Sequence, residues 1–188
     1  ALLTAKLKHE NIVDIFDVQT DDECYLVMEM LVGCDLRTHL ARAVRLPWVE
    51  VRGIMLQLCD AMQFAHEHGV VHRDLKPANC FRLEPSGRIK ILDLGIAKPM
   101  TPELDAGGPI TKTGATAGTP PYMAPEHICG QVDVRTDIYS AGVLMFELLT
   151  GRRPFRGKGP ELLRQIVNLP PPPLTSVADD LDCPRGAE

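Results

Sequence analysis

Five polar side chains of different chemistry fall within eight residues of the sequence, at positions 72–79 of "GVVHRDLKPANC". A connecting turn needs Gly, Pro, Asn or Ser rather than this mixture. Asp74 can take a proton, Lys76 can hold a phosphate, and Asn79 can offer an amide oxygen to a metal ion. A lone histidine such as His72 is more often a buried residue satisfied by a backbone carbonyl, so the hypothesis of chemistry depends on the other three side chains.

A second carboxylate follows a predicted hairpin. The segment "NCFRLEPSGRIKILDLG" predicts two short strands around a Pro-Ser-Gly turn, and Asp93 lies where the second strand ends, close to Gly95. A carboxylate at a strand end, beside a glycine that permits a sharp turn, could bind a divalent cation together with Asn79.

The elements that must position these groups are strands first and mostly helices afterwards. Residues 11–18 and 24–30, rich in Val, Ile, Phe and Tyr, predict a pair of strands. Apolar residues spaced by three and four predict a long helix over 46–69, with Pro47 in its first turn and Gly69 just beyond its end. This order predicts an α+β fold in which a helical body carries a small hairpin.

The remaining segments predict shorter helices and two irregular stretches. The segment "LVGCDLRTHLARA" predicts a turn at Gly33 and then a short helix, the apolar run 136–151 predicts a helix ended by Gly151, and "ELLRQIV" predicts another. Residues 99–121, dominated by Pro, Gly, Thr and Ala, have no periodicity, which is typical of a functional or disordered loop. The run "LPPPPL" is expected to be extended.

Composition excludes several classes of protein. The chain has 188 residues, 45% of them apolar and 24% charged, which suits one sizeable core. Its net charge of −5, without a basic block, disfavours nucleic acid or an anionic membrane as the main partner. The six cysteines form no C-x-x-C pair, which argues against a metal site with cysteine ligands and fits a reducing compartment. No apolar run reaches membrane-spanning length, since "AGVLMFELLTG" is short and carries Glu147.

The order of the motifs resembles that of the eukaryotic-type protein kinases, and "LLTGRRPF" together with the "PPPPL" run is most similar to bacterial members. "HRDLKPAN" (72–79) resembles the catalytic loop, and "DLG" (93–95) resembles the metal-binding D-F-G with Leu94 in place of Phe. "APE" (124–126), preceded by "GTPPYM", resembles the end of the activation segment, here 93–126. Three motifs in this order and spacing are a strong signal, and the similarity extends from "LKHENIV" to "LLTGRRPF".

The resemblance implies a role for each polar residue of the predicted site. Asp74 would accept or orient the proton of the substrate hydroxyl, and Lys76 would contact the transferring phosphate of ATP. Asn79 and Asp93 would hold Mg²⁺ bridging the ATP phosphates. Thr119 would lie near Asp74 and Lys76. Such chemistry depends on positioning and charge neutralisation rather than on covalent work by the protein.

A second set of residues would bind the nucleotide. "YLVMEML" resembles the strand that leads to the adenine-binding hinge, with Met28 as gatekeeper and with Glu29 and Leu31 offering backbone groups to adenine. Asp35 could reach the ribose, and Phe81 would lie under the adenine. For Met28 and Leu31, an ordinary core position is an equally good interpretation.

Further residues would regulate or support the site. Arg73, beside the catalytic Asp, is the family's mark of kinases activated by loop phosphorylation, and Thr111 and Thr113 lie where bacterial relatives carry a T-x-T pair. Alternatively, the threonines of this loop are merely polar. Asp137 in "DIYSAG" resembles the helix-start Asp that holds the catalytic loop, although it could also serve only as a helix N-terminal carboxylate. Glu126 would pair with an Arg beyond these residues.

The pattern H-R-D-L-K-P-x-N, with a Thr before "PPYMAPE", resembles serine/threonine kinases. It implies transfer of the ATP γ-phosphate to Ser or Thr of protein substrates, with autophosphorylation in the activation loop. A pseudokinase or scaffold would be expected to have lost Asp74, Asn79 or Asp93, and all three are present. A small-molecule phosphotransferase is disfavoured by "GTPPYMAPE", because in the family that segment docks protein substrates.

Two features of the kinase pattern do not occur in the sequence, namely a G-x-G-x-x-G loop and a V-A-I-K strand. We therefore expect residues 1–32 to be the remnant of an N-lobe (the end of helix C, two strands and the hinge). Residues 33–188 would form a C-lobe without its last helices. The chain alone is expected to be inactive and poorly folded. The catalytic domain is expected in the cytoplasm, with any membrane anchor supplied by segments outside this chain.

Overall fold

The computed structural model describes residues 7–19, 25–94 and 119–178, and every structural statement below refers to these ranges. Two small antiparallel sheets form the β part. In the first, β1 (Ile15–Gln19) pairs with β2 (Tyr25–Met28). The second has the order β3-β4-β5 and consists of β3 (Gly33–Asp35), β4 (Cys80–Leu83) and β5 (Ile89–Ile91).

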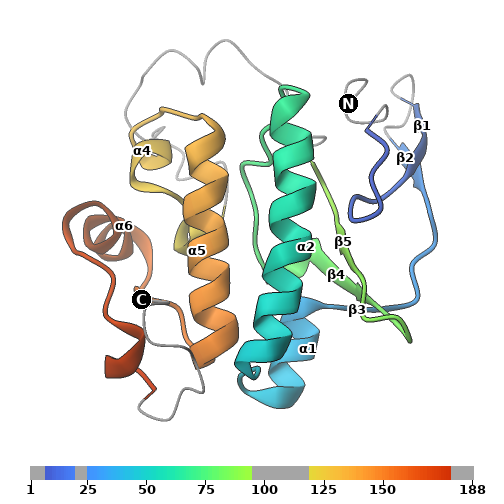
Figure 1. Cartoon of the computed structure of the whole chain (residues 1–188). Coiled ribbons are helices and arrows are strands. Elements are labelled where there is room, and N and C mark those ends of the chain that lie inside the picture. Colours follow the sequence, from blue (N-terminus) through green and yellow to red (C-terminus); the bar gives the residue numbers. More distant parts are fainter. Residues whose placement is uncertain (1–6, 20–24, 95–118, 179–188) are drawn as a thin grey trace.

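Helices form the other half of the molecule. They are α1 (Leu36–Ala43), α2 (Trp48–Glu67), α4 (Pro125–Ile128), α5 (Val134–Thr150) and α6 (Gly159–Asn168), with short 3₁₀ helices at Pro77–Asn79, Pro120–Tyr122 and Leu174–Ser176. The two long helices α2 and α5 lie side by side, with the sheets on the far side of α2 and with α4 and α6 beyond α5 (Figure 1). The α+β class is therefore confirmed.

The long helix α2 forms because its apolar residues recur on one face. Six of them are buried against the core: Val51, Ile54, Leu58, Ala61, Met62 and Ala65. Pro47 is the N-cap, one position before the helix rather than inside it, and Gly69 follows the C-cap with a φ of 72°. The predicted helix is confirmed to within two residues at each end.

The second long helix, α5, begins two residues earlier than predicted because of a capping box. The carboxylate of Asp133 accepts a hydrogen bond from the backbone N–H of Arg135, and the Asp133 N–H donates to the Thr136 hydroxyl. Gly151 ends the helix with a φ of 70°. A Cβ there would lie 2.3 Å from the carbonyl oxygen of Val44, so the loop after α1 packs directly onto this end of α5.

The strands differ from the prediction in two places. The turn expected at Gly33 is a short strand, β3, whose pairing with β4 is so close that a Cβ on Gly33 would lie 2.0 Å from the Arg82 carbonyl oxygen. The predicted strand 11–18 is split. Its first part runs along β5, where Val13 N–H donates to the Ile91 carbonyl (3.0 Å), and only the second part forms β1. The predicted hairpin of β4 and β5 is confirmed.

The apolar core lies in the helical half and under the second sheet. Its fully buried members include Leu36, Leu58, Leu75, Ile91 and Leu144. The first sheet contributes little to this core, and several of its large apolar side chains, together with those just after it, are exposed: Phe16, Tyr25, Val27, Met28, Met30 and Val32. Within the described ranges, no helix combines the length and the apolar character that crossing a membrane requires.

Candidate active site

The segment 69–80 connects the C-terminal end of α2 to β4 and carries the predicted catalytic residues. Leu75 is completely buried in the core and lies between Asp74 and Lys76 in the sequence. The 3₁₀ helix Pro77–Asn79 then leads directly into β4. An apolar anchor in the middle of the segment and a strand at its end fix the backbone from which the polar side chains project.

Asp74, Lys76 and Thr119 form a hydrogen-bonded cluster, although Thr119 is more than forty residues away in the sequence. Lys76 Nζ donates to Asp74 Oδ2 and to Thr119 Oγ1, at 2.6 Å each. Asp74 Oδ1 accepts from both the N–H and the hydroxyl of Thr119, at 3.0 Å each. The carboxylate is thus oriented by a cation and by two donors of the segment that precedes α4. The structure places these three residues together, as the resemblance implies.

Asp137, in the first turn of α5, holds the backbone of the catalytic segment through hydrogen bonds. Its side chain is 1% exposed and accepts from the His72 N–H (2.8 Å) and the Arg73 N–H (2.9 Å). His66 Nε2, near the end of α2, lies 2.8 Å from the same carboxylate. Arg73 has a φ of 69°, which is costly for a residue with a side chain, and these bonds stabilise that conformation. Asp137 is both a helix N-terminal carboxylate and the support of the loop.

His72 is a buried structural residue rather than a group exposed to substrate. It is 2% exposed, and its Nδ1 accepts from the Asp74 N–H at 3.3 Å. Desolvation lowers the pKa of His72, although the negative charges of Asp137 and Asp74 act in the opposite direction. The neutral imidazole therefore supports the backbone on the N-terminal side of the catalytic carboxylate.

Asn79 and Asp93, the predicted metal ligands, are brought together by the backbone. Asn79 Nδ2 donates to the Asp74 carbonyl (2.9 Å), which leaves the amide oxygen as its acceptor. The Leu92 N–H donates to the Asn79 carbonyl (2.9 Å), so Asp93 lies one residue from this contact, with its side chain exposed. Two oxygen ligands suit a hard divalent cation. Because the described residues contain no cluster of three His, Cys, Asp or Glu ligands, such an ion would need further oxygens, as phosphates supply.

The predicted hinge follows β2. Met28 is 39% exposed and Leu31 is half-buried. The Glu29 N–H donates to the Asp14 carbonyl at 2.9 Å, so of the two backbone groups of Glu29 the N–H is already engaged within the chain. The Glu29 side chain is anchored by Lys90 of β5, whose Nζ lies 2.6 Å from Glu29 Oε1.

Asp35 and Phe81, the other predicted nucleotide contacts, face each other across β3 and β4 as register partners. The Asp35 carboxylate is the N-cap of α1: it accepts from the Thr38 N–H (2.8 Å) and from the Thr38 hydroxyl (3.1 Å). A contact between Asp35 and a ribose would therefore compete with the cap. Phe81 is half-buried in the middle strand of the second sheet.

The predicted regulatory residues are only partly visible. Thr111 and Thr113 lie outside the described residues, and Arg73 is half-buried beside Asp74. Glu126 lies in the first turn of α4 and is half-buried. Within the described ranges it forms no ion pair of 4.0 Å or less, although its negative charge is one of the causes that raise the pKa of Arg135 and of Tyr139.

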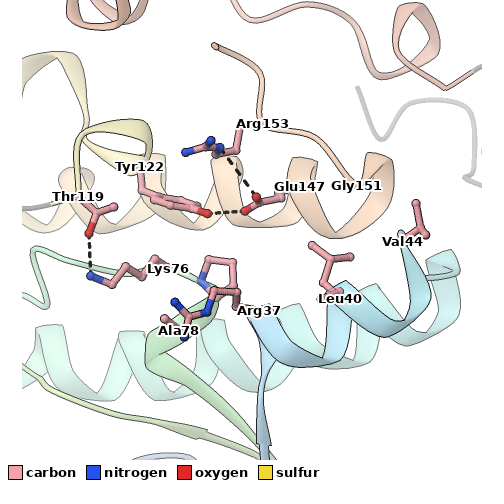
Figure 2. A pocket seen from close by; sticks show the side chains of 12 residues that line it. Arg37, Leu40, Val44, Lys76, Ala78, Thr119, Tyr122, Glu147, Gly151 and Arg153 are labelled. Carbon is pink, nitrogen blue, oxygen red and sulfur yellow. Dashed lines mark hydrogen bonds and ion pairs between the residues drawn. The ribbon is translucent and has the colours of Figure 1, made fainter. Parts of the chain in front are cut away.

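A hollow of about 650 Å³ opens beside the Asp74–Lys76–Thr119 cluster (Figure 2). Its walls come from α1, the catalytic segment, the 3₁₀ helix before α4 and the end of α5. Tyr122 and Glu147 meet in its wall, with the phenol donating to Glu147 Oε2 at 2.5 Å. In the sequence, Glu147 stands out only as a charge within an apolar helix. The spacing between Tyr122 and Glu147 contains no signal that they would meet.

Comparison with known proteins agrees with these motifs. The family model "Protein kinase domain" matches residues 1–175. Serine/threonine-protein kinase Pkn1 of Myxococcus xanthus is 45% identical over 177 residues, covering 90% of this chain and 24% of that protein. Serine/threonine-protein kinase PknA of Mycobacterium tuberculosis is 40% identical over 182 residues, which are 93% of this chain and 41% of the relative. The probable serine/threonine-protein kinase PknB of Corynebacterium glutamicum is 35% identical over 184 residues, at 94% and 28% coverage. The chain thus spans between about a quarter and two fifths of the length of these relatives.

Proposed function

Because the chain belongs to the protein kinase domain family, we propose that the protein containing it is a serine/threonine protein kinase that uses ATP and Mg²⁺. The observation that carries the proposal is the cluster of Asp74, Lys76 and Thr119 next to Asn79. It combines a carboxylate, a cation and an amide oxygen, which are the groups that transfer of a phosphoryl group requires.

Asp74 supplies the base of the proposed reaction. A Ser or Thr hydroxyl of the substrate would donate its hydrogen bond to the carboxylate, which Thr119 holds through Oδ1 and Lys76 holds through Oδ2. The carboxylate would orient the hydroxyl oxygen towards the γ-phosphorus and take up the proton as the new O–P bond forms and the bond from the γ-phosphorus to the β,γ-bridging oxygen breaks, so that ADP leaves. Lys76 Nζ, fixed between Asp74 and Thr119, neutralises charge on the phosphoryl group that moves.

Asn79 and Asp93 would hold Mg²⁺, which neutralises the charge on the β- and γ-phosphates when bound. The structure supports this role in two ways: the Asn79 amide nitrogen is already engaged by the Asp74 carbonyl, and Asp93 is exposed at the end of the segment after β5. Glu29, Leu31 and the flanking hinge residues would receive the adenine.

We place the catalytic domain in the cytoplasm, where ATP is available. The four cysteines of the described ranges are free thiols, which suits a reducing compartment. Attachment to a membrane through other segments of the full-length protein is compatible with this placement.

The proposal is tested with purified full-length protein, γ-labelled ATP and a generic protein substrate, with Mg²⁺ or with excess chelator. Phosphoserine or phosphothreonine that forms only with Mg²⁺ is the expected result. Binding of ATP without any transfer would indicate a pseudokinase. Transfer to small molecules but not to protein would indicate a different phosphotransferase.

A further inference from the structure

The hollow beside the active-site cluster continues into a second one, and the two together form a groove lined by positive charge. The second hollow, of about 520 Å³, is lined by Arg152, Arg156 and three residues that it shares with the first, namely Glu147, Gly151 and Arg153. Of the charged side chains that line the two hollows in the described ranges, five are cationic and only Glu147 is anionic. The cationic residues are Arg37, Lys76, Arg152, Arg153 and Arg156. The chain as a whole carries a net charge of −5, so this local excess of positive charge runs against its average.

The single carboxylate of the groove is already engaged. Glu147 Oε2 accepts from the Tyr122 hydroxyl at 2.5 Å, and Glu147 Oε1 lies 3.9 Å from Arg153 Nε. Burial is the main cause that raises the pKa of the Tyr122 phenol, and the hydrogen bond to Glu147 raises it further, whereas the charges of Arg153 and Arg37 lower it. Both guanidinium groups therefore act on the same point of the groove, from opposite walls (Figure 2). The two guanidinium groups would therefore repel a cationic ligand, and both oxygens of Glu147 are already in contact with Tyr122 or Arg153.

The arginines retain capacity for an incoming anion. The Arg37 side chain is 74% exposed and has only a distant contact of 3.9 Å with Asp35 Oδ1. The Arg153 side chain is 39% exposed, and Arg152 and Arg156 are exposed. A guanidinium presents several N–H donors in a plane and matches a carboxylate with two parallel hydrogen bonds. Lys76, by contrast, is committed to Asp74 and Thr119 at the catalytic end of the groove.

We propose that this groove selects acidic segments of protein substrates, with Asp or Glu side chains near the acceptor Ser or Thr bound by Arg37 and Arg153. The inference rests on the proposed kinase function and specifies the substrate class of that site. Because the groove begins at Lys76 and Thr119, a segment whose hydroxyl reaches Asp74 continues directly into it. The flanking arginines Arg152 and Arg156 extend the preference to more than one acidic residue.

The test uses full-length kinase and a positional-scanning peptide library around a fixed Ser or Thr, in which each neighbouring position is in turn Asp, Glu, Ala or Lys. Acidic residues should raise kcat/KM over Ala by about 1.4-fold to fivefold for each guanidinium engaged, the range expected of partly exposed ion pairs. Lys at the same positions should lower kcat/KM. The preference should weaken at high salt, because exposed charges are screened.

Variants assign the effect to the groove. Arg37→Gln and Arg153→Gln should each reduce the ratio of kcat/KM for acidic over neutral peptides, and Arg37→Glu should reverse the preference towards Lys. Arg42→Gln removes an exposed arginine of the same helix that does not line the groove, and it should leave the ratio unchanged. A kinase that phosphorylates neutral and acidic peptides equally would overturn this inference and leave the proposed function standing. Failure to phosphorylate any Ser or Thr peptide would overturn both.

Discussion

Replacing Asp137 by Asn in the full-length protein is expected to cost about 2–5 kcal/mol of unfolding free energy. The carboxylate is 1% exposed and accepts hydrogen bonds from two backbone N–H groups, while His66 Nε2 contacts it as well. An amide has one oxygen, so its NH₂ group must face a backbone N–H of His72 or of Arg73. That buried donor is left without an acceptor, at about 1–3 kcal/mol. The remaining bonds lose their ionic character, which costs about 1 kcal/mol each.

Urea denaturation of the wild-type protein and of the Asp137→Asn variant measures this loss. Asp133→Asn is the matched control: it makes the same substitution four residues earlier on an exposed N-cap, where Asn serves as well as Asp, and it should cost less than about 0.5 kcal/mol. The Asp137→Asn variant should also lose kinase activity, because Asp137 holds Arg73 at a positive φ next to Asp74. An Asp137→Asn variant as stable as the control would refute the role of this carboxylate as the support of the catalytic segment.

Three further predictions concern other residues. Thr119→Val should lower kcat by about tenfold to a hundredfold, since the hydroxyl orients Asp74, whereas Thr119→Ser should keep most of the wild-type rate in a peptide assay. Burial lowers the pKa of His72 below its ordinary value of 6.5, so the unfolded state binds the proton more tightly. As the pH decreases below about 6.5, the unfolding free energy should therefore decrease, and it should decrease more steeply in the wild type than in His72→Asn. Parallel pH profiles of the two proteins would count against this prediction. Mass spectrometry of the autophosphorylated full-length protein should find phosphate on Thr111 or Thr113, and modification only at distant sites would argue against that prediction.

The sequence was sufficient for the main elements and for the residues of the catalytic cluster. Periodicity located α2, which buries an apolar stripe, an apolar run located α5, and glycines marked the ends of both. The motif order predicted that Asp74, Lys76 and Thr119 would be neighbours, although Thr119 lies 45 residues after Asp74 and 43 residues after Lys76. The structure places them within hydrogen-bonding distance.

Other features depended on tertiary contacts that no local pattern encodes. The strand β3 is short and contains Gly33, so its composition indicated a turn, and only its pairing with β4 makes it a strand. The ion pair of Lys90 with Glu29 joins residues sixty-one positions apart. In the sequence, Lys90 lies between two isoleucines of a predicted strand, and this pattern indicates no partner for it. The meeting of Tyr122 with Glu147 likewise follows from the packing of the segment before α4 onto α5.

In the proposed reaction, Asp74 performs the proton step and Asp93 holds the metal that binds the nucleotide phosphates. The most direct measurement combines calorimetric Mg-ATP binding with the rate of phosphoryl transfer in full-length wild type, Asp74→Asn and Asp93→Asn. Asp74→Asn should bind Mg-ATP as tightly as the wild type and transfer no phosphate, because only the base is lost. Asp93→Asn should lose transfer and also bind Mg-ATP more weakly, because a charge on the metal is removed. A folded Asp74→Asn variant that phosphorylates protein at nearly the wild-type rate would contradict the account.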